Sequence, residues 1–397
     1  MPNLFVLKKI SEGSPLAYIF LAFIAMAGLS YVNFLPGVVN ALAGGIGFSD
    51  VEAGQIVASN TYGGLLGSVI AIFLVRRVNW QRALFVFFIG LILFDVTTMW
   101  INSYAGMLGW RFSAGIFGGL CVGVAFSVLA RLSNPDRAFG ALLFIQFCIG
   151  SLVIYLLPVF ETTYSEHAVF LVMAGFSLLS VIFLIFLPRL QHKPKAALPG
   201  TSFSTMFAYA LLLLLSIAFY QVGASAIWAY VGLIGLGAGI ADESVSVYIA
   251  LTGLLGLLGA ALPVISGNRF GRLHWVVAGV VLSMLSAALL RFSTQASVYV
   301  VAMALLFFSW PAVLSFLLAV TSELDSSGRL STIANVVSFI GLASGPLLGA
   351  SLLDNGNFSM MLNACVITFL LSLFLLFKPV RVQEQGLGVS LSSQFQY

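Results

Sequence analysis

Nearly all of the chain from Leu16 to Phe377 consists of apolar runs, each about 20 residues long and closed by a short polar turn. A run of that length is what an α-helix needs to cross the hydrocarbon core of a bilayer. Only 8% of the 397 residues are charged, whereas about a quarter are charged in an ordinary soluble protein. We therefore expect an all-α membrane protein that crosses the bilayer many times, and the soluble globular classes are excluded.

The pattern predicts twelve spans with one interruption in the middle. The spans are expected near residues 15–40, 51–75, 82–101, 104–130, 138–158, 168–187, 205–236, 245–266, 275–291, 297–320, 330–352 and 358–377. Between the sixth and the seventh lies the only long polar run, Pro188–Thr201. The predicted organisation is an N-terminal segment (1–14), a first six-helix bundle (15–188), a linker (189–204), a second six-helix bundle (205–379) and a tail (380–397).

The basic residues predict the orientation. If both termini face the cytoplasm, the cytoplasmic side holds all of the 17 Lys and Arg residues except Arg111 and Arg291. Cytoplasmic loops of membrane proteins carry such an excess of positive charge. The sequence therefore predicts a multi-pass protein of an inner or plasma membrane with both termini and the linker in the cytoplasm. The pI near 9.0 follows from these loop cations, so a nucleic-acid partner is not expected.

The two halves of the chain resemble each other. Gly64-Leu-Leu-Gly67 recurs 189 residues later as Gly253-Leu-Leu-Gly256, and Tyr31 is matched by Tyr220 at the same offset. Parallel repeats of this kind are typical of secondary transporters. We therefore expect two pseudo-symmetric six-helix bundles that face each other across a central cavity.

Two charged residues lie well inside predicted spans, where an ionised side chain is costly and is by default functional or paired. Arg111 lies in the fourth span and Asp95 in the third. At 1.5 Å per residue, both lie roughly 10 Å below the outer surface, so they are expected to meet. One interpretation makes Arg111 a substrate ligand and Asp95 a proton carrier. The alternative is a structural ion pair that joins the two spans.

Candidate substrate residues are the polar and aromatic side chains inside spans. Beside Arg111 they are Tyr31, Asn33, Asn60, Gln146, Tyr220, Gln221, Trp228 and Asn335. A buried amide in lipid must find a hydrogen-bond partner, so each of these side chains faces either the cavity or a neighbouring helix. The sequence does not decide between these two environments.

Three motifs resemble those of the major facilitator superfamily. Arg111-Phe-Ser-Ala-Gly115 is similar to its fourth-span motif, Asn268-Arg-Phe-Gly-Arg272 resembles its loop signature with Asn in place of Asp, and Gly341-Leu-Ala-Ser-Gly345-Pro346-Leu-Leu-Gly349 resembles its glycine-proline helix motif. The resemblance covers the whole chain and implies that fold. It also implies a conformational role for the motif residues Asn268, Arg269, Gly271, Arg272, Gly341, Gly345 and Pro346.

Departures from the family pattern narrow the expected mechanism. The loop Val75–Arg82 keeps the positive charge of the loop signature but has neither its carboxylate nor its glycine. The first span has no acid, whereas drug and proton antiporters of the superfamily often carry one there. This argues against multidrug antiport of that kind and leaves Asp95 as the candidate proton carrier within the membrane.

The expected function is secondary active transport of a small organic solute by alternating access, coupled to protons. Export is favoured because the loops are short and there is no large soluble insert. Uptake of an organic anion with Arg111 as its ligand is the alternative, and a non-transporting assembly protein or a lipid-acting enzyme is the alternative of another class. No protease helix, nucleophile elbow or phosphate loop is visible, so neither enzyme activity nor a cofactor or metal is expected. The expected partners are the solute, protons and membrane lipid, with a monomer expected by analogy with the fold.

Overall fold

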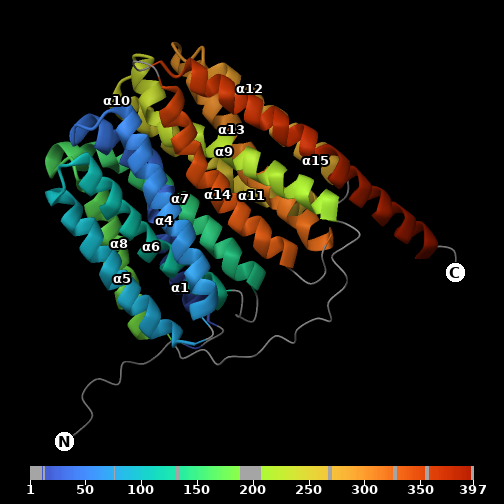
Figure 1. Cartoon of the computed structure of the whole chain (residues 1–397), viewed down its shortest axis with the longest axis horizontal. Helices are drawn as coiled ribbons and strands as arrows, with labels where there is room; N and C mark the ends of the chain where they lie inside the picture. The colour runs from blue at the N-terminus through green and yellow to red at the C-terminus, as the bar shows by residue number, and fades with distance from the viewer. Residues whose placement is uncertain are drawn as a thin grey trace, which may run out of the picture. The chain divides into compact units, whose positions relative to one another are not determined.

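The computed structural model describes residues 11, 14–75, 77–129, 135–187, 207–266, 271–324, 329–353 and 357–394, and nearly all of them are helical (Figure 1). The expectation of an all-α protein is therefore confirmed. The chain divides into two compact units, Met1–Lys195 and Ala196–Tyr397. The predicted linker lies outside the described residues.

The elements of the first unit follow in chain order. They are α1 (Pro15–Gly28), α2 (Ser30–Asn33), α3 (Leu35–Asn40), the π-helix η1 (Ala41–Gly45), α4 (Asp50–Leu74), α5 (Trp80–Thr97), the 3₁₀-helix η2 (Thr98–Trp100), α6 (Tyr104–Leu129), α7 (Pro135–Thr163) and α8 (Ala168–Phe186). Those of the second unit are α9 (Phe207–Gly237), α10 (Asp242–Gly253), α11 (Leu255–Ser266), α12 (Arg272–Leu290), α13 (Ala296–Leu324), α14 (Arg329–Leu352) and α15 (Ser359–Gln394).

The helices account for the predicted spans. In the described part of the chain, ten helices are long and apolar enough to cross a membrane, and α10 with α11 forms one of them. Three shorter apolar helices, Pro15–Gly28, Leu35–Gly45 and Val336–Leu352, supply the rest. The first two divide the predicted first span, and the third is the apolar part of α14. The twelve-span fold predicted from the sequence is therefore confirmed.

The first span is broken rather than continuous. Leu29 ends α1, the four-residue α2 follows, and Phe34 (φ −105°, ψ 20°) separates α2 from α3. Pro36 is one cause, because it has no N–H to donate to the carbonyl of Val32 and its ring crowds the preceding turn. The break places Tyr31 and Asn33 on a short, irregular segment.

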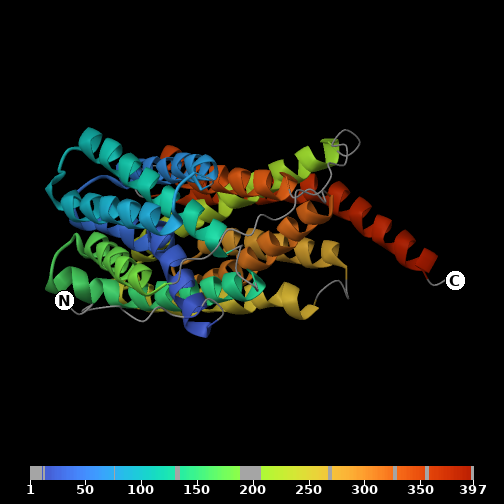
Figure 2. The ribbon, with the colours of Figure 1, turned by 90° about the horizontal axis from the view of Figure 1, so that it is seen from below.

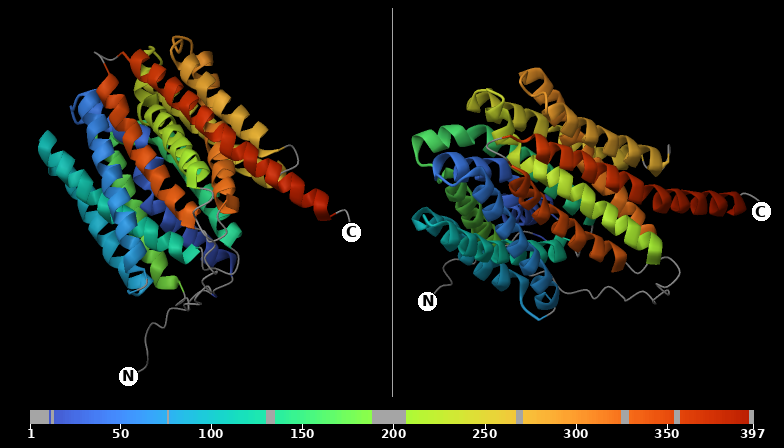
Figure 3. Two further views of the ribbon diagram at one scale, coloured as in Figure 1. Left: turned by 45° about the vertical axis from the view of Figure 1, so that its right-hand side comes forward. Right: turned by 45° about the horizontal axis from the view of Figure 1, so that its top comes forward.

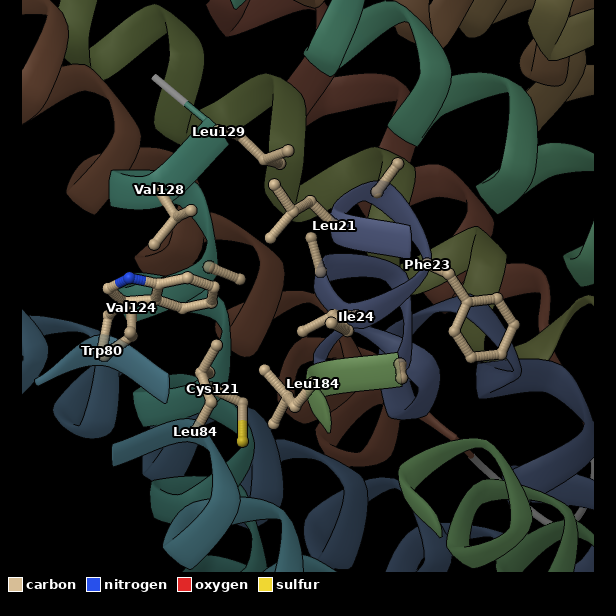
Figure 4. Packing of buried hydrophobic residues seen from close by; sticks show 14 of the residues in the cluster. Leu21, Phe23, Ile24, Trp80, Leu84, Cys121, Val124, Val128, Leu129 and Leu184 are labelled. Carbon is tan, nitrogen blue, oxygen red and sulfur yellow. The ribbon is translucent and has the colours of Figure 1, made fainter. Parts of the chain in front are cut away.

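The core of the first unit forms where α1, α5, α6 and α8 meet. Leu21 and Ile24 of α1, Leu84 of α5, Cys121 of α6 and Leu184 of α8 belong to one buried cluster (Figure 4). In a bilayer this packing acts mainly through van der Waals contact, since lipid chains are as apolar as the helices. The cluster fixes the α5–α6 and α5–α8 pairs on which the polar site depends.

Glycines allow the closest helix contact of the first unit, between α4 and α6. A methyl group on Gly67 would collide with the carbonyl oxygen of Ile116, and one on Gly119 would collide with that of Gly64. Small residues let transmembrane backbones approach in this way. Gly63 and Gly67 therefore permit the close approach of α4 to α6.

Two helices run further than the sequence indicated. α7 continues through Pro158 to Thr163, whereas the fifth span was expected to end at that proline. α15 continues through Pro379 to Gln394 and extends past its neighbours in the second unit (red in Figures 2 and 3). The predicted tail is therefore helical up to that residue.

Candidate functional site

A buried ion pair joins α5 to α6. Asp95 lies in the last turn of α5, and the short connection through η2 returns the chain so that Arg111 of α6 lies beside it. Arg111 Nη1 lies 2.8 Å from Asp95 Oδ1, and the two side chains are 1% and 2% exposed. The same nitrogen also donates to Thr98 Oγ1 at 3.1 Å. The structure thus brings the two charges together as the sequence predicts, and their role in transport stays a prediction.

Two aromatic rings flank the Arg111 guanidinium. Its Cζ lies 4.7 Å from the centroid of the Tyr31 ring and 4.9 Å from that of Phe170, a buried residue in the first turn of α8. Cation–π attraction of this kind strengthens when the cation is desolvated. The positive charge is therefore balanced by a carboxylate, a hydroxyl and two ring faces. Sequence reasoning missed Phe170, because nothing distinguishes it among 35 phenylalanines.

The broken first span carries polar atoms without partners. Tyr31 OH and Asn33 Nδ2, both on α2, are buried and donate no hydrogen bond to any described residue. Arg111 Nε is in the same condition. A buried donor without a partner costs about 1–3 kcal/mol, so such atoms are candidates for solute contact. The predicted site residues Tyr31 and Asn33 therefore keep hydrogen-bonding capacity.

The two other predicted amides of the first unit differ from each other. Asn60 of α4 donates through Nδ2 to the carbonyl oxygen of Arg111 at 2.8 Å, so its donor joins two helices. Gln146 of α7 is half-buried and makes no side-chain hydrogen bond within the described part of the chain. Of the two, Gln146 has the amide that is available to a ligand.

An uncharged network occupies the interior of the second unit. Gln221 of α9 donates through Nε2 to Ser338 Oγ of α14 at 2.6 Å and accepts from Trp310 Nε1 of α13 at 2.6 Å. Gln221 is 1% exposed, so both bonds lie in a low-dielectric interior, where they are strong. The predicted residue Gln221 is thus the junction of three helices. The sequence did not predict its pairing with Trp310 and Ser338.

The remaining predicted residues of the second unit have other surroundings. Tyr220 OH bonds to Ser283 Oγ at 2.9 Å, which places it toward α12. Trp228 packs edge-on against Phe307 of α13, with the centroids 5.2 Å apart. Asn335 lies on α14, and its side chain is outside the described part of the chain. The structure therefore does not gather all of the predicted residues around Gln221.

The glycines of the α14 motif lie against α9. A Cβ on Gly341 would lie 2.7 Å from the carbonyl oxygen of Ala218, and one on Gly345 would lie 2.6 Å from the backbone nitrogen of Ala226. These glycines therefore permit close approach of the two helices. α14 continues as a helix through Pro346.

The loop motif leads into α12. Asn268 and Arg269 lie outside the described residues, while Gly271 has a φ of 79° and Arg272 begins the helix. Only glycine adopts such a φ readily, which explains the residue type at this position. Leu273 N donates to Oε1 of Glu384 in α15 at 2.7 Å. Sequence reasoning missed Glu384, because it lies in the stretch predicted to be a tail.

Twelve spans, with a polar interior in each unit, define the class of multi-pass membrane transporters. The model of the Major Facilitator Superfamily matches residues 18–343, so the chain belongs to that family. No curated protein sequence matches the chain significantly.

Two solved structures share the fold. The crystal structure of a single-site mutant of the nucleoside transporter NupG has a TM-score of 0.70 at 12% identity and covers 91% of this chain and 98% of its own. The crystal structure of a D-xylose-proton symporter has a TM-score of 0.71 at 16% identity and covers 90% of this chain and 96% of its own. At these identities the likeness concerns the fold alone.

Proposed function

We propose that this protein is a secondary transporter of a small, uncharged polar solute, working by alternating access and coupled to protons through Asp95. The observation that carries the proposal is the charge balance of the buried polar groups. Arg111 is compensated by Asp95 at 2.8 Å, and the network around Gln221 contains no charge. While Asp95 is ionised, a net charge on the solute would meet no uncompensated opposite charge among these groups, whereas hydroxyl or amide groups would find donors and acceptors.

The same balance weighs against the organic-anion alternative. With Asp95 ionised, Arg111 would have to release it before it could bind a carboxylate, and breaking a buried pair costs about 3–5 kcal/mol. Tyr31 OH can instead donate or accept a hydrogen bond, and Asn33 Nδ2 can donate one. Neither group is charged. They suit the hydroxyl, carbonyl or ring-nitrogen groups of a neutral solute.

A thermal-shift screen of the purified protein tests the solute class. Sugars and nucleosides are expected to raise the melting temperature with dose, because a ligand that binds only the folded state stabilises it. Tyr31→Phe keeps the ring over Arg111 but removes the hydroxyl, so the shift is expected to shrink. Tyr155→Phe is the matched control, because Tyr155 is 51% exposed on α7. Shifts only from organic acids, or only from lipophilic cations, would reject the proposed class.

Proton coupling rests on Asp95 as the carboxylate deep within a span. Asp95→Asn is expected to abolish flux driven by a pH gradient while solute exchange continues. Both rates are measured in the same proteoliposomes, so exchange reports that the variant is folded. If the ratio of gradient-driven flux to solute exchange in Asp95→Asn equals that of the wild type, Asp95 does not take part in proton coupling.

The proposed topology has both termini in the cytoplasm, and export is the proposed direction. The charge pattern of the loops supports the first, and the short loops support the second. An impermeant thiol reagent added outside should label Tyr164→Cys, which lies at a 76% exposed position, but not Arg77→Cys. Raised drug or sugar tolerance in a pump-deficient host would support export, whereas a new growth substrate would establish uptake.

A non-transporting membrane protein is the rival from another class, and water access separates the two. Cysteines at positions 33, 146 and 221 are expected to react with a small water-borne thiol reagent in at least one state of a transporter. Complete protection of all three positions in every condition would favour the rival.

A single chain is proposed as the working unit.

A further inference from the structure

The first unit has a groove on its outer face between α5 and α8, apart from the Arg111 site. Its volume is about 440 Å³, and its lining includes Gln81, Arg82, Phe85, Val86, Leu184 and Ile185. The α5 residues come from the first two turns of that helix, and the α8 residues come from its last two. The groove therefore lies at the end of the unit that the charge pattern predicts to be cytoplasmic.

The groove has a polar end and an apolar body. Phe85, Val86 and Ile185 are 48%, 58% and 50% exposed. In a chain that spans a membrane, apolar side chains with this exposure face lipid chains. The polar end is formed by Gln81 and Arg82, where α5 begins. This order of polar and apolar groups matches that of a phospholipid, with its headgroup at the surface and its acyl chains below.

The cation at the polar end is available to a ligand. The Arg82 guanidinium is exposed and makes no ion pair or hydrogen bond with any residue the structure describes. The backbone N–H groups of Gln81 and Arg82 are taken by Asn79 Oδ1, at 3.0 and 3.3 Å. The guanidinium is therefore the donor that an anion would meet. A planar guanidinium suits two oxygens of one phosphate.

The walls of the groove are held together at this same end. Gln81 Nε2 donates to the carbonyl oxygen of Leu187, just after the last residue of α8, at 3.0 Å. This bond ties the start of α5 to the end of α8, so the spacing of the two helices is set by the protein. The groove is thus a formed feature of the first unit.

We propose that the α5–α8 groove binds one anionic phospholipid of the cytoplasmic leaflet, with its phosphate on Arg82 and an acyl chain along Phe85, Val86 and Ile185. Basic pockets between transmembrane helices on the cytoplasmic side recognise anionic headgroups in this way. The zwitterionic phosphatidylcholine carries its own cation and gains less from Arg82. The site is independent of the solute that the protein transports.

The test uses native mass spectrometry of the full chain in detergent, titrated with phosphatidylglycerol or phosphatidylcholine. Wild-type protein is expected to bind phosphatidylglycerol more tightly, and Arg82→Gln should weaken that binding about fivefold, as loss of one surface cation near a lipid headgroup implies. Arg77→Gln is the matched control, because Arg77 is exposed just before α5 but does not line the groove. It should leave the preference unchanged.

Two further experiments test the apolar body of the groove and the need for acyl chains. Val86→Trp fills the apolar body at an exposed position and should weaken binding of both lipids. Inorganic phosphate and glycerol 3-phosphate should not compete with phosphatidylglycerol at equal concentration, because they lack acyl chains. Equal affinity for the two lipids in the wild type, an unchanged preference in Arg82→Gln, or full competition by glycerol 3-phosphate would overturn the proposal.

Discussion

The two units solve one problem, buried polar groups inside a membrane bundle, in different ways. The first unit holds opposite charges, with Arg111 paired to Asp95 and flanked by Tyr31 and Phe170. The second unit holds an amide, an indole and a hydroxyl around Gln221 and contains no charge there. The repeat therefore preserves the helices but not the chemistry between them.

The glycine contacts differ between the units in a related way. In the first unit, glycines bring together α4 and α6, which are the second and fourth spans. In the second unit, Gly341 and Gly345 bring together α9 and α14, the seventh and eleventh spans. The second unit also repeats the contact of the first, because Gly259 of α11, in the eighth span, lies against the backbone of Phe308 in α13, the tenth span. The second unit therefore has an additional tightly joined pair, α9 and α14, and this pair adjoins its polar centre.

The largest effect is expected from breaking the ion pair of the first unit. Asp95→Ala leaves the Arg111 charge buried with only Thr98 and two aromatic rings for partners. The free energy of unfolding should therefore fall by about 3–5 kcal/mol. The double variant Asp95→Asn with Arg111→Gln is expected to lose less stability than Asp95→Ala alone, because it leaves no buried charge uncompensated. Melting temperatures in detergent measure both. If the double variant is the less stable, the pair is not the source of the stability.

Glycine replacement should follow in size and tests the tightly joined helix pairs. Gly119→Ala would place a methyl group against the backbone of Gly64, so α4 and α6 would have to separate, at a cost of roughly 1–3 kcal/mol. Gly345→Ala tests the α9–α14 pair of the second unit in the same way. Gly109→Ala, on the same helix as Gly119, meets nothing within 4 Å and should be neutral or stabilising. Equal melting temperatures for Gly109→Ala and Gly119→Ala would mean that α4 and α6 pack less closely.

A smaller loss of stability is expected when the uncharged network of the second unit is broken. Gln221→Leu removes two hydrogen bonds and leaves Trp310 and Ser338 unpaired, which costs about 1–3 kcal/mol. The loss should remain below that of Asp95→Ala, because no buried charge is involved. A double-mutant cycle with Trp310→Phe measures the coupling between the two side chains. A loss as large as that of Asp95→Ala would erase the proposed difference between the units.

Much of the architecture was predictable because it depends on local sequence. The twelve spans follow from run length and hydropathy, and the meeting of Asp95 with Arg111 follows from helical rise and one short turn. Phe170 was not predictable, since its contact with Arg111 depends on how the distant helix α8 packs. The break in the first span was overlooked, although Pro36 offered a signal for it.

The ends of helices show the same division between local and distant information. Asn79 stands directly before α5 and accepts hydrogen bonds from the N–H groups of Gln81 and Arg82, so its role can be read from its position. α12 begins after Gly271, which has no side chain to cap it. Its acceptor is Glu384, which is 111 residues away from Leu273 along the chain.

The smallest loss of stability is expected from removing these two caps, one in each unit. Asn79→Ala and Glu384→Ala should each cost about 1 kcal/mol, the usual value of a helix cap. Hydrogen exchange should rise at the Gln81 and Arg82 amides in the first variant and at Leu273 in the second. Glu384→Gln keeps an acceptor oxygen and should retain most of the protection at Leu273. A chain ending at Gln383 should instead match Glu384→Ala at Leu273. If the shortened chain keeps the Leu273 amide protected from hydrogen exchange, α12 does not depend on α15 for its cap. The starts of α5 and α12 would then both be capped by nearby residues of the chain.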